Sequence, residues 1–351
     1  MLNWLQSGFC TLLLLFSTPI LGTEMKKQST VAQKEKTFIN YMAKRYHFKH
    51  EKLVAALSQA KYDEEVIFHI THPYEKKPWY VYRHYFITEK RIQDGINYWK
   101  VHARALEYAE RRYSVPPGVI VAIIGIETDY KERIGKYSAL NALTTLAFHY
   151  NHRTKFFTRE LTQFFLLIEE QRLPLPLLRS SYAGAIGIPQ FMPSTYRHYA
   201  VTYTKQGHID LMNNDEDAIV SIANFLHANG WHKNQPIACA FTSKKPLDPQ
   251  LISKRTIPKI SIKQLKNKGI IPSIPIHDTK KAAIIQLKME NGHEKWLVFA
   301  NFSVIMRYNP RIIYAMTVYQ LSQSLQKRYD QQAPGTRNST TPTKKPQKQR
   351  S

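Results

Sequence analysis

The sequence has few cysteines, few acidic residues and no long apolar run in its body. It contains 2 cysteines in 351 residues, Cys10 and Cys239. If an N-terminal segment with Cys10 is removed, Cys239 has no partner for an internal disulfide and cannot supply a zinc cluster, so we interpret it as a small buried hydrophobic residue. After residue 25 no stretch approaches the ~20 continuous apolar residues that cross a bilayer, which excludes a membrane-spanning body.

Basic residues outnumber acidic ones by 50 to 26, which gives a formal net charge of +24. This balance indicates an anionic partner or an anionic environment, and nucleic acid, an acidic membrane and an acidic cell-wall polymer all fit. The chain is also 43% hydrophobic and 12% aromatic. It can therefore bury a large core, which excludes a disordered polyelectrolyte.

The N-terminus carries a candidate export signal. Residues 9–21 form an apolar run too short for a membrane span, and a lysine-rich polar stretch follows. We predict a cleaved signal peptide over residues 1–22. An uncleaved anchor stays open as an alternative, because no Lys or Arg precedes the run. Cys10 lies before the leucines, so lipid anchoring of a mature N-terminus is not expected.

Helical spacing of apolar residues dominates the centre of the chain. The pattern predicts a long helix capped by Thr88, a second helix after the break at 116–118, and a third capped by Thr158. A further helix is expected to end at Gly230. The fold class is therefore predicted as mainly α.

The pattern changes after Trp231. Residues 244–281 carry ten Lys or Arg and two Asp, and the following alternating apolar residues lead to Asn291-Gly292, a two-residue hairpin signal. This indicates a small β-rich insertion. Residues 331–351 contain no acidic residue and few apolar ones, which predicts a disordered basic tail.

Glu127 is the first candidate catalytic residue. It ends an almost wholly apolar run, 119–126, where desolvation would favour the protonated carboxyl and raise its pKa toward ~6. A solvated or capping Glu is the alternative at such a position. Asp129 lies two positions further, which on a helix points elsewhere, so the two do not form a facing carboxylate pair.

The second candidate is the segment 180–196, SSYAGAIGIPQFMPSTY. Its small residues allow backbones to approach closely, while Gln190, Phe191 and Tyr196 supply amide and aromatic surface. Aromatic faces stack on sugar rings, and amides bind N-acetyl and hydroxyl groups, so this mixture suits a sugar site. Tight helix packing by small residues is the alternative.

These segments carry a resemblance. AIIGIETDYKERIG, LNALTTLAFHYNHRTKFF, SYAGAIGIPQFMPSTY, DAIVSIANFLHANGW and NFSVIMRYNPRIIYAMTVYQL stand in the order and approximate spacing of lytic murein transglycosylase B, glycoside hydrolase family 103, over roughly residues 36–325. The resemblance implies a lysozyme-like helical core with an additional helical domain and a small β-rich insertion. The expected divisions are a signal peptide at 1–22, a linker at 23–35, a helical domain at 36–115, the lysozyme-like core at 116–231, the β-rich domain at 232–300, a core-completing segment at 301–328 and the basic tail at 329–351.

The implied activity is cleavage of the bond between N-acetylmuramic acid and N-acetylglucosamine in peptidoglycan without water, leaving a 1,6-anhydromuramyl end. Glu127 matches the family's single acid/base, which explains why no second carboxylate is needed. The residues that match the family's substrate-contacting positions are Arg153, Ser181, Gln190, Tyr308, Asn309 and Tyr314. The family also implies a Gram-negative periplasm as the location, and we expect a monomer.

Several positions depart from the family pattern. Lys131 and Pro189 replace glycines, and either could alter the cleft. Some members carry an EF-hand-like calcium loop, which matches residues 202–210 here. Uncharged side chains stand at three expected ligand positions and a lysine lies among them: Thr202, Thr204, Lys205 and Gln206. We therefore expect no metal or other cofactor, and we interpret three nearby acids as helix-start residues: Asp210, Asp215 and Asp217.

Other functions remain as alternatives. A non-catalytic peptidoglycan-binding protein would keep the fold and lose turnover through the altered cleft. A nucleic-acid binder explains the charge alone, so nucleic acid is not an expected partner. A hydrolytic lysozyme needs a second base, for which the sequence offers no residue at suitable spacing. The basic tail either holds the enzyme on an anionic envelope surface or is dispensable.

Overall fold

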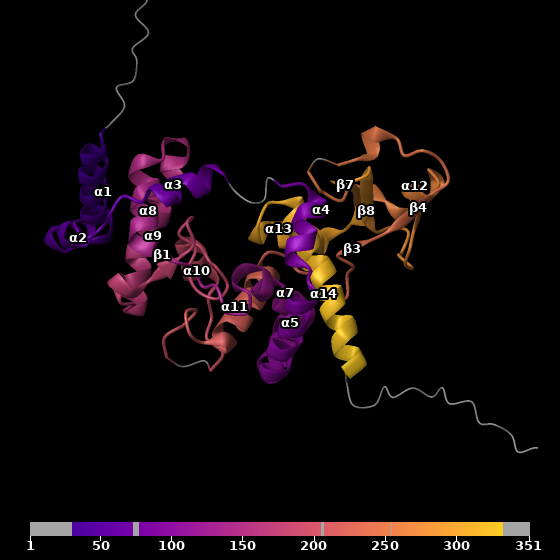
Figure 1. Cartoon of the computed structure of the whole chain (residues 1–351), viewed down its shortest axis with the longest axis horizontal. Coiled ribbons are helices and arrows are strands. Elements are labelled where there is room, and N and C mark those ends of the chain that lie inside the picture. The colour runs from indigo at the N-terminus through magenta and orange to yellow at the C-terminus, as the bar shows by residue number, and fades with distance from the viewer. Residues whose placement is uncertain (1–29, 73–76, 205–206, 254, 333–351) are drawn as a thin grey trace, which may run out of the picture.

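The structure is a computed structural model, and it describes residues 30–72, 77–204, 207–253 and 255–332. Helices α1, α2, α8 and α9 lie at one end of the molecule, α5, α7 and α14 lie in the middle, and the longer strands lie at the other end (Figure 1). The predicted signal peptide at 1–22 lies outside the described residues, and so does the tail from residue 333. No described helix is long and apolar enough to cross a membrane.

The helices are α1 (Val31–Tyr46), α2 (His50–Leu57), α3 (Glu64–Thr71), α4 (Trp79–Phe86), α5 (Glu89–Val101), α6 (Ala103–Tyr113), α7 (Pro117–Thr128), α8 (Ala139–Thr144), α9 (Thr154–Gln171), α10 (Pro193–Tyr199), α11 (Asp215–Ala228), α12 (Ile262–Asn267), α13 (Ala300–Tyr308) and α14 (Ile312–Gln332). The strands are β1 (Tyr137–Ser138), β2 (Arg179–Ser180), β3 (Ala238–Cys239), β4 (Phe241–Ser243), β5 (Ile260–Ser261), β6 (Ile270–Pro272), β7 (Lys281–Lys288) and β8 (His293–Val298). A π-helical segment, Thr145–His149, continues α8.

Helix α7 is the centre of the main core. It begins at Pro117, where a proline costs no hydrogen bond, and its residues from Pro117 to Gly125 are all buried. A helix that is apolar all round must be covered on every side. Here α5, α6, α11 and α14 pack around it. Replacing Ile123 by Ala is expected to cost about 2–5 kcal/mol of stability, because its side chain is fully buried.

Some predicted helix limits are confirmed and others are wrong. Thr88 caps α5 by accepting from the N–H of Arg91, as predicted. The helix that follows does not run on unbroken, because His102 separates α5 from α6. Helix α9 begins at Thr154, so the prediction that Thr158 caps it is wrong. The 3-10 turn before α9 runs directly into the helix, and Thr158 instead accepts a hydrogen bond within its second turn.

The ends of the folded body differ from the predicted divisions. Thr30 and Gln33 form a capping box that starts α1 at Val31, inside the predicted linker at 23–35. At the other end, α14 continues to Gln332, past the boundary expected at residue 328. The ring of Tyr329 stacks on that of Trp99 at a centroid distance of 4.3 Å. This contact on α5 holds the last turns of the helix in place.

The helices within the predicted helical domain at 36–115 pack on two different parts of the core. Helices α1 and α3 contact the π-helical segment Thr145–His149, whereas α5 and α6 pack on α7. Phe38 of α1 approaches Phe148 and Phe165 with ring centroids 6.0 and 5.9 Å apart. Apolar faces far apart in sequence thus meet across the predicted boundary at residue 115. One continuous hydrophobic cluster includes both groups of helices.

The β-rich insertion lies where the sequence predicts it. The strand order of its main sheet is β3-β8-β7-β5, and all pairs are antiparallel. The hairpin between β7 and β8 turns at Asn291-Gly292, where Gly292 has φ 82°. Cys239 is buried in the separate small core of this insertion, as expected. The prediction of a mainly α fold with a small β-rich insertion is confirmed.

Candidate active site

Glu127 lies in the last turn of α7 and is half-buried. Three residues with positive φ follow it, at 52°, 56° and 80°: Asp129, Tyr130 and Lys131. Left-handed residues end a helix, so the chain turns away directly after Glu127. The carboxylate of Asp129 pairs with the Arg91 guanidinium at 3.0 Å. Asp129 is thus bound by Arg91, and its not forming a catalytic carboxylate pair with Glu127 stays a prediction.

The two tyrosines predicted for the site meet at Glu127. The hydroxyl of Tyr314 donates to Oε1 of Glu127 at 2.6 Å. The ring of Tyr308 lies nearly parallel to that of Tyr314, at 11° and 6.3 Å between centroids. Burial, and secondly the charge of Glu127, raise the pKa of both phenols well above the usual value. Both phenols therefore keep their protons at neutral pH, and Tyr314 acts as a hydrogen-bond donor.

The 180–191 segment is folded against the turn that follows Glu127. The amide nitrogen of Gln190 donates to the carbonyl oxygens of Ile134 and Gly187, at 3.3 and 2.8 Å. A Cβ on Gly135 would lie 2.4 Å from the carbonyl oxygen of Ser180, so the two backbones touch at a position that requires glycine. Gln190 thus joins this segment to the turn that follows Glu127.

Ser181 and Pro189 hold the same segment in shape. The hydroxyl oxygen of Ser181 accepts from the N–H groups of Ala183 and Ala185, at 3.3 and 3.2 Å. The carbonyl oxygen of Pro189 accepts from the hydroxyl of Tyr308. Pro189 is one of the departures from the family pattern, and its carbonyl links the segment to the tyrosine pair beside Glu127.

Lys131, the other departure, extends to the start of α11. Its ammonium group donates to the carboxylate of Asp215 at 2.7 Å, and the hydroxyl of Tyr98 donates to the same carboxylate at 3.0 Å. Burial, and then the charge of Asp215, raise the pKa of Tyr98 well above its usual value. The lysine therefore ties the turn that follows Glu127 to α11 through a buried acid.

Asn309 and Arg153 are placed differently from each other. Asn309 directly follows α13 beside Tyr308, and its carbonyl oxygen accepts from the N–H of Arg311 at 2.8 Å. Arg153 is exposed just before α9, with its guanidinium 4.1 Å from the ring centroid of Phe156. No hydrogen bond or ion pair joins Arg153 to another residue in the described part of the chain. The structure thus brings Glu127, Tyr308, Tyr314, Gln190 and Ser181 into one connected group, and leaves Arg153 outside it.

Glu160 is a site-supporting residue that the sequence analysis missed. Only 1% of Glu160 is exposed, and its carboxylate accepts from both the N–H and the hydroxyl of Ser194, at 3.0 and 2.9 Å. These bonds fix the start of α10, directly after the 180–191 segment. The sequence contained a signal for this residue, because Glu160 stands beside Leu161 on the apolar stripe of α9. Buried acids are rare unless they are paired, so an acid at such a position indicates a buried partner.

The acids near the predicted calcium loop bind backbone groups. The carboxylate of Asp217 accepts from the N–H groups of Tyr203 and Asp210, at 2.7 and 3.1 Å. Asp215 and Asp217 lie in the first turn of α11, as predicted, whereas Asp210 lies in the loop before it and accepts from the N–H groups of Met212 and Asn213, so its assignment to a helix start is wrong. Within the described ranges, which omit 205 and 206, no group of three or more His, Cys, Asp or Glu could hold a metal ion. The donor set of these residues does not fit calcium, and the absence of calcium stays a prediction.

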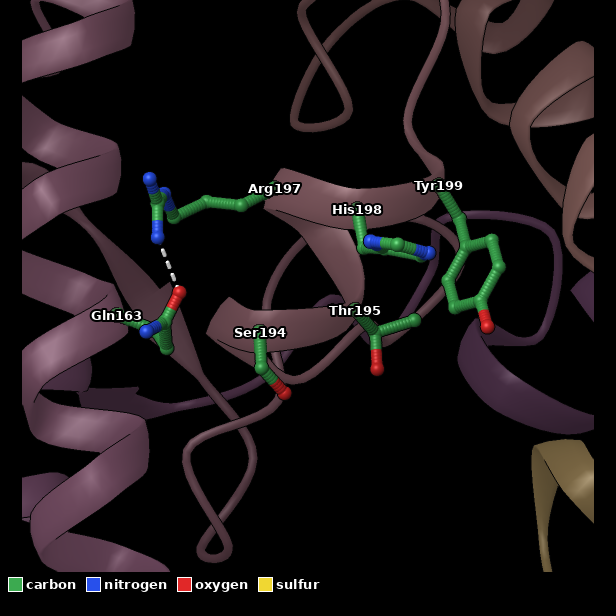
Figure 2. A pocket seen from close by; sticks show the side chains of 6 residues that line it. All are labelled: Gln163, Ser194, Thr195, Arg197, His198 and Tyr199. Carbon is green, nitrogen blue, oxygen red and sulfur yellow. Dashed lines mark hydrogen bonds between the residues drawn. The ribbon is translucent and has the colours of Figure 1, made fainter.

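A polar hollow of about 460 Å³ lies between α9 and α10. Figure 2 shows the side chains of Gln163 and Arg197 pointing toward each other across it, joined by a hydrogen bond. Arg197 also pairs with Glu170. None of the predicted site residues lines this hollow. The charge of Arg197 is already neutralised by Glu170, so the Glu127 group is the better candidate for the catalytic site.

Comparison with known proteins agrees with this geometry. A family described as "Transglycosylase SLT domain" matches residues 30–323. The chain is also 38% identical over 299 residues to membrane-bound lytic murein transglycosylase B of Escherichia coli (strain K12), covering 82% of this chain and 81% of the relative. This chain belongs to the lytic murein transglycosylase B family. It is a lytic transglycosylase that acts on peptidoglycan.

Solved structures of transglycosylases share the fold. Soluble lytic transglycosylase SltB1 from Pseudomonas aeruginosa is 35% identical, with a TM-score of 0.79 over 85% of this chain and 99% of that one. SLT35 of Escherichia coli, solved in complex with calcium, is 36% identical, with a TM-score of 0.78 over 85% and 94%. SltB3 from Pseudomonas aeruginosa, solved with NAG-anhNAM-pentapeptide, is 25% identical, with a TM-score of 0.75 over 85% and 80%. The resemblance inferred from the sequence motifs is confirmed.

Proposed function

We propose that Glu127 is the single acid/base of this transglycosylase. Its protonated carboxyl donates a proton to the oxygen between N-acetylmuramic acid and N-acetylglucosamine as the bond from that oxygen to C1 breaks. The N-acetyl group of the substrate stabilises the oxocarbenium-like centre at C1. The carboxylate of Glu127 then takes the proton of the C6 hydroxyl, whose oxygen bonds to C1 and closes the 1,6-anhydro ring. No water is consumed, and Glu127 ends protonated as it began.

The observation that supports this role is the environment of the carboxyl group. One oxygen accepts from Tyr314, which keeps its proton, and the neighbouring acid Asp129 is bound to Arg91. Tyr314 therefore orients Glu127 without competing for its proton. A single carboxyl with an orienting phenol suits two successive proton transfers at one face of the sugar, whereas hydrolysis with inversion needs a second base about 6.5–9.5 Å away.

We propose that the sugar on either side of the bond lies between the 180–191 segment and the start of α14. The residues with amide groups on the two sides are Gln190 and Asn309, and amides suit N-acetyl and hydroxyl groups. Ser181 holds the backbone of the segment through its hydroxyl. The exposed guanidinium of Arg153, which lies apart from this group, is suited to a carboxylate of a stem peptide further along the strand.

Mass spectrometry of products tests the role of Glu127. Purified peptidoglycan is incubated with the mature protein, with Glu127→Gln and with the matched control Glu132→Gln, whose exposed carboxyl lies five positions later. We expect anhydro products, one water lighter than hydrolytic ones, from the parent and from the control. Glu127→Gln should reduce their formation by at least about 10²-fold, because general acid–base catalysis contributes about 10²–10⁴-fold. Reducing-end products from the parent would refute the anhydro mechanism.

We further propose that the protein is exported to the periplasm. The support is the apolar run at 9–21 in the sequence, together with the Escherichia coli relative, which is described as membrane-bound. Cell fractionation followed by N-terminal sequencing tests both export and cleavage. A mature N-terminus near residue 23 in the periplasmic fraction is the expected result, and full-length protein in the membrane fraction would favour an uncleaved anchor.

A further inference from the structure

Two adjoining hollows lie where the β-rich insertion meets the helical core. Their volumes are about 340 and 280 Å³, and Gln235 lines both. The first is lined also by His232, Lys280 and Lys281. In the second, the partly exposed Tyr319 and the largely buried Trp231 lie beside two glutamines of α14, Gln323 and Gln326. We call the two together the Gln235 groove.

The Gln235 groove is separate from the catalytic group. Gly118, near the start of α7, lines it, and Glu127 lies nine residues later on the same helix. At 1.5 Å per residue, this places the groove about 13 Å from Glu127. Helix α14 runs the other way, with Tyr314 at Glu127 and Ser322 at the groove. A Cβ on Gly118 would lie 3.1 Å from the carbonyl oxygen of Ser322, so the two helices are in contact there.

The side chains of the groove suit an N-acetylated sugar. The side-chain amides of Gln235 and Gln323 make no hydrogen bond to another residue in the parts of the chain that the structure describes. Amides with free donors and acceptors can bind N-acetyl and hydroxyl groups, and the partly exposed ring of Tyr319 can pack on a pyranose ring. This is the combination that the sequence analysis associated with a sugar site, at a second place in the fold.

The other end of the groove is positively charged. Lys280 and Lys281 line it and are exposed, and no Asp or Glu lines either hollow. The N–H of Lys263 bonds to the carbonyl oxygen of Asp278 nearby, and the carboxylate of Asp278 is already paired with Lys266 at 2.7 Å. Carboxylates, such as those of peptidoglycan stem peptides, are therefore favoured there over neutral groups.

We propose that the Gln235 groove is a second, non-catalytic binding site for a peptidoglycan strand. Its glutamines and the ring of Tyr319 hold the N-acetylated glycan, and Lys280 and Lys281 hold stem-peptide carboxylates. The proposal goes beyond the catalytic role of Glu127 because it involves no residue of the catalytic group. Binding one strand in the groove raises the effective concentration of neighbouring strands at the cleft. The enzyme would thus stay on an insoluble sacculus between cleavage events.

Binding to sacculi tests the groove with catalysis removed. All proteins carry Glu127→Gln. One variant adds Gln235→Ala and Gln323→Ala, and a second adds Lys280→Gln and Lys281→Gln. Cosedimentation with purified sacculi measures the dissociation constant. We expect each variant to bind about tenfold more weakly than its parent, because it loses two hydrogen bonds or two ion contacts to the strand.

A charge-matched control separates the groove from general attraction. Lys36→Gln with Lys52→Gln removes two exposed lysines from α1 and α2, at the far end of the molecule (Figure 1), and should leave binding unchanged. Higher salt should abolish the effect of the lysine variant and keep that of the glutamine variant, because screening acts on charges. Equal losses in the control and the lysine variant, with none in the glutamine variant, would overturn the proposal.

Turnover separates the groove from the catalytic cleft and from folding. With Glu127 present, the groove variants should cleave a soluble tetrasaccharide muropeptide at the parent rate within twofold, and cleave sacculi several-fold more slowly. Equal losses on both substrates would overturn the proposal. Vesicles with anionic phospholipid provide the last comparison. If the parent binds them and the glutamine variant loses that binding while it keeps binding to sacculi, the groove recognises a lipid surface instead.

Discussion

The hydroxyl of Tyr314 offers the sharpest test of the proposed chemistry. It lies 2.6 Å from Oε1 of Glu127 and keeps its own proton, because burial and the neighbouring carboxylate raise its pKa. A donor stabilises a carboxylate more than it stabilises a neutral carboxyl. The Tyr314→Phe variant therefore removes stabilisation mainly from the charged form of Glu127, and the pKa of Glu127 should rise.

The magnitude follows from hydrogen-bond energies. Bonds to charged groups contribute about 1.5–3 kcal/mol and neutral ones about 0.5–1.5 kcal/mol, so the two protonation states differ by roughly 1.4 kcal/mol. That difference corresponds to about one pH unit. Since the proposed mechanism needs Glu127 protonated at the start, activity is lost as pH rises through its pKa. In Tyr314→Phe, the alkaline limb of the kcat/KM profile should move up by about one pH unit.

The assay is the rate of anhydro product from a soluble tetrasaccharide muropeptide between pH 4 and 9. Tyr308→Phe is the matched control, because its hydroxyl donates to the backbone of Pro189 and its ring lies beside that of Tyr314. Its alkaline limb should stay in place. A limb that stays or moves down in Tyr314→Phe would refute the reasoning. Equal movement in both variants would assign the effect to packing of the rings.

Three further predictions concern stability. The hydroxyl of Tyr130 is buried without a partner in the described part of the chain, so Tyr130→Phe should leave the free energy of unfolding unchanged or raise it by up to about 1 kcal/mol. Tyr196→Phe loses the bond to the carbonyl of Ile209 and leaves the N–H of Leu211 without its acceptor, so it should lower the free energy of unfolding by about 1–3 kcal/mol. Urea unfolding measures both, and a reversed order would contradict the assignment. Lys131 has φ 80° and pairs with Asp215. Lys131→Gly should be about 1 kcal/mol more stable than Lys131→Ala, because both variants lose the ion pair and only glycine adopts this positive φ without strain. Equal stabilities in thermal unfolding would argue against backbone strain at this position. Burial raises the pKa of Tyr196 to about 12, so between pH 10 and 12 the unfolded chain loses the phenol proton while the folded chain keeps it. The free energy of unfolding should therefore fall with pH more steeply in the parent than in Tyr196→Phe, by about 1.4 kcal/mol per pH unit. Identical slopes in urea unfolding at alkaline pH would disprove this.

Local signals in the sequence predicted several elements of the fold. A side-chain cap at Thr88, a proline at the start of an apolar run and Asn291-Gly292 between alternating residues each act through nearby backbone, so they can be interpreted without the tertiary structure. The predictions that failed are those where neighbours in space decide. Thr158 has the chemistry of a cap, but the 3-10 turn before Thr154 already continues the chain into α9.

The division of the helical part depended on packing. The sequence shows amphipathic faces on α1 and α5 without showing which faces meet, since many pairings bury a similar apolar area. Only the structure places α1 on the α8–α9 side and α5 against α7. In the same way, the last turns of α14 resemble the start of a polar tail in sequence, and their order rests on the stacking of Tyr329 on Trp99.

For the site, the sequence by itself determined the chemistry. A single Glu at the end of a buried helix, the glycine-rich segment and the tyrosines after residue 307 were enough to identify the family and to predict Glu127 as its acid/base. The tertiary structure alone decided how these groups act on one another. Tyr314 meets Glu127 across 187 positions, and Tyr308 meets Pro189 across 119. Lys131 reaches Asp215 across 84. Hydrogen bonds and ion pairs act over a few ångströms, so only folding can create contacts between residues so far apart in sequence.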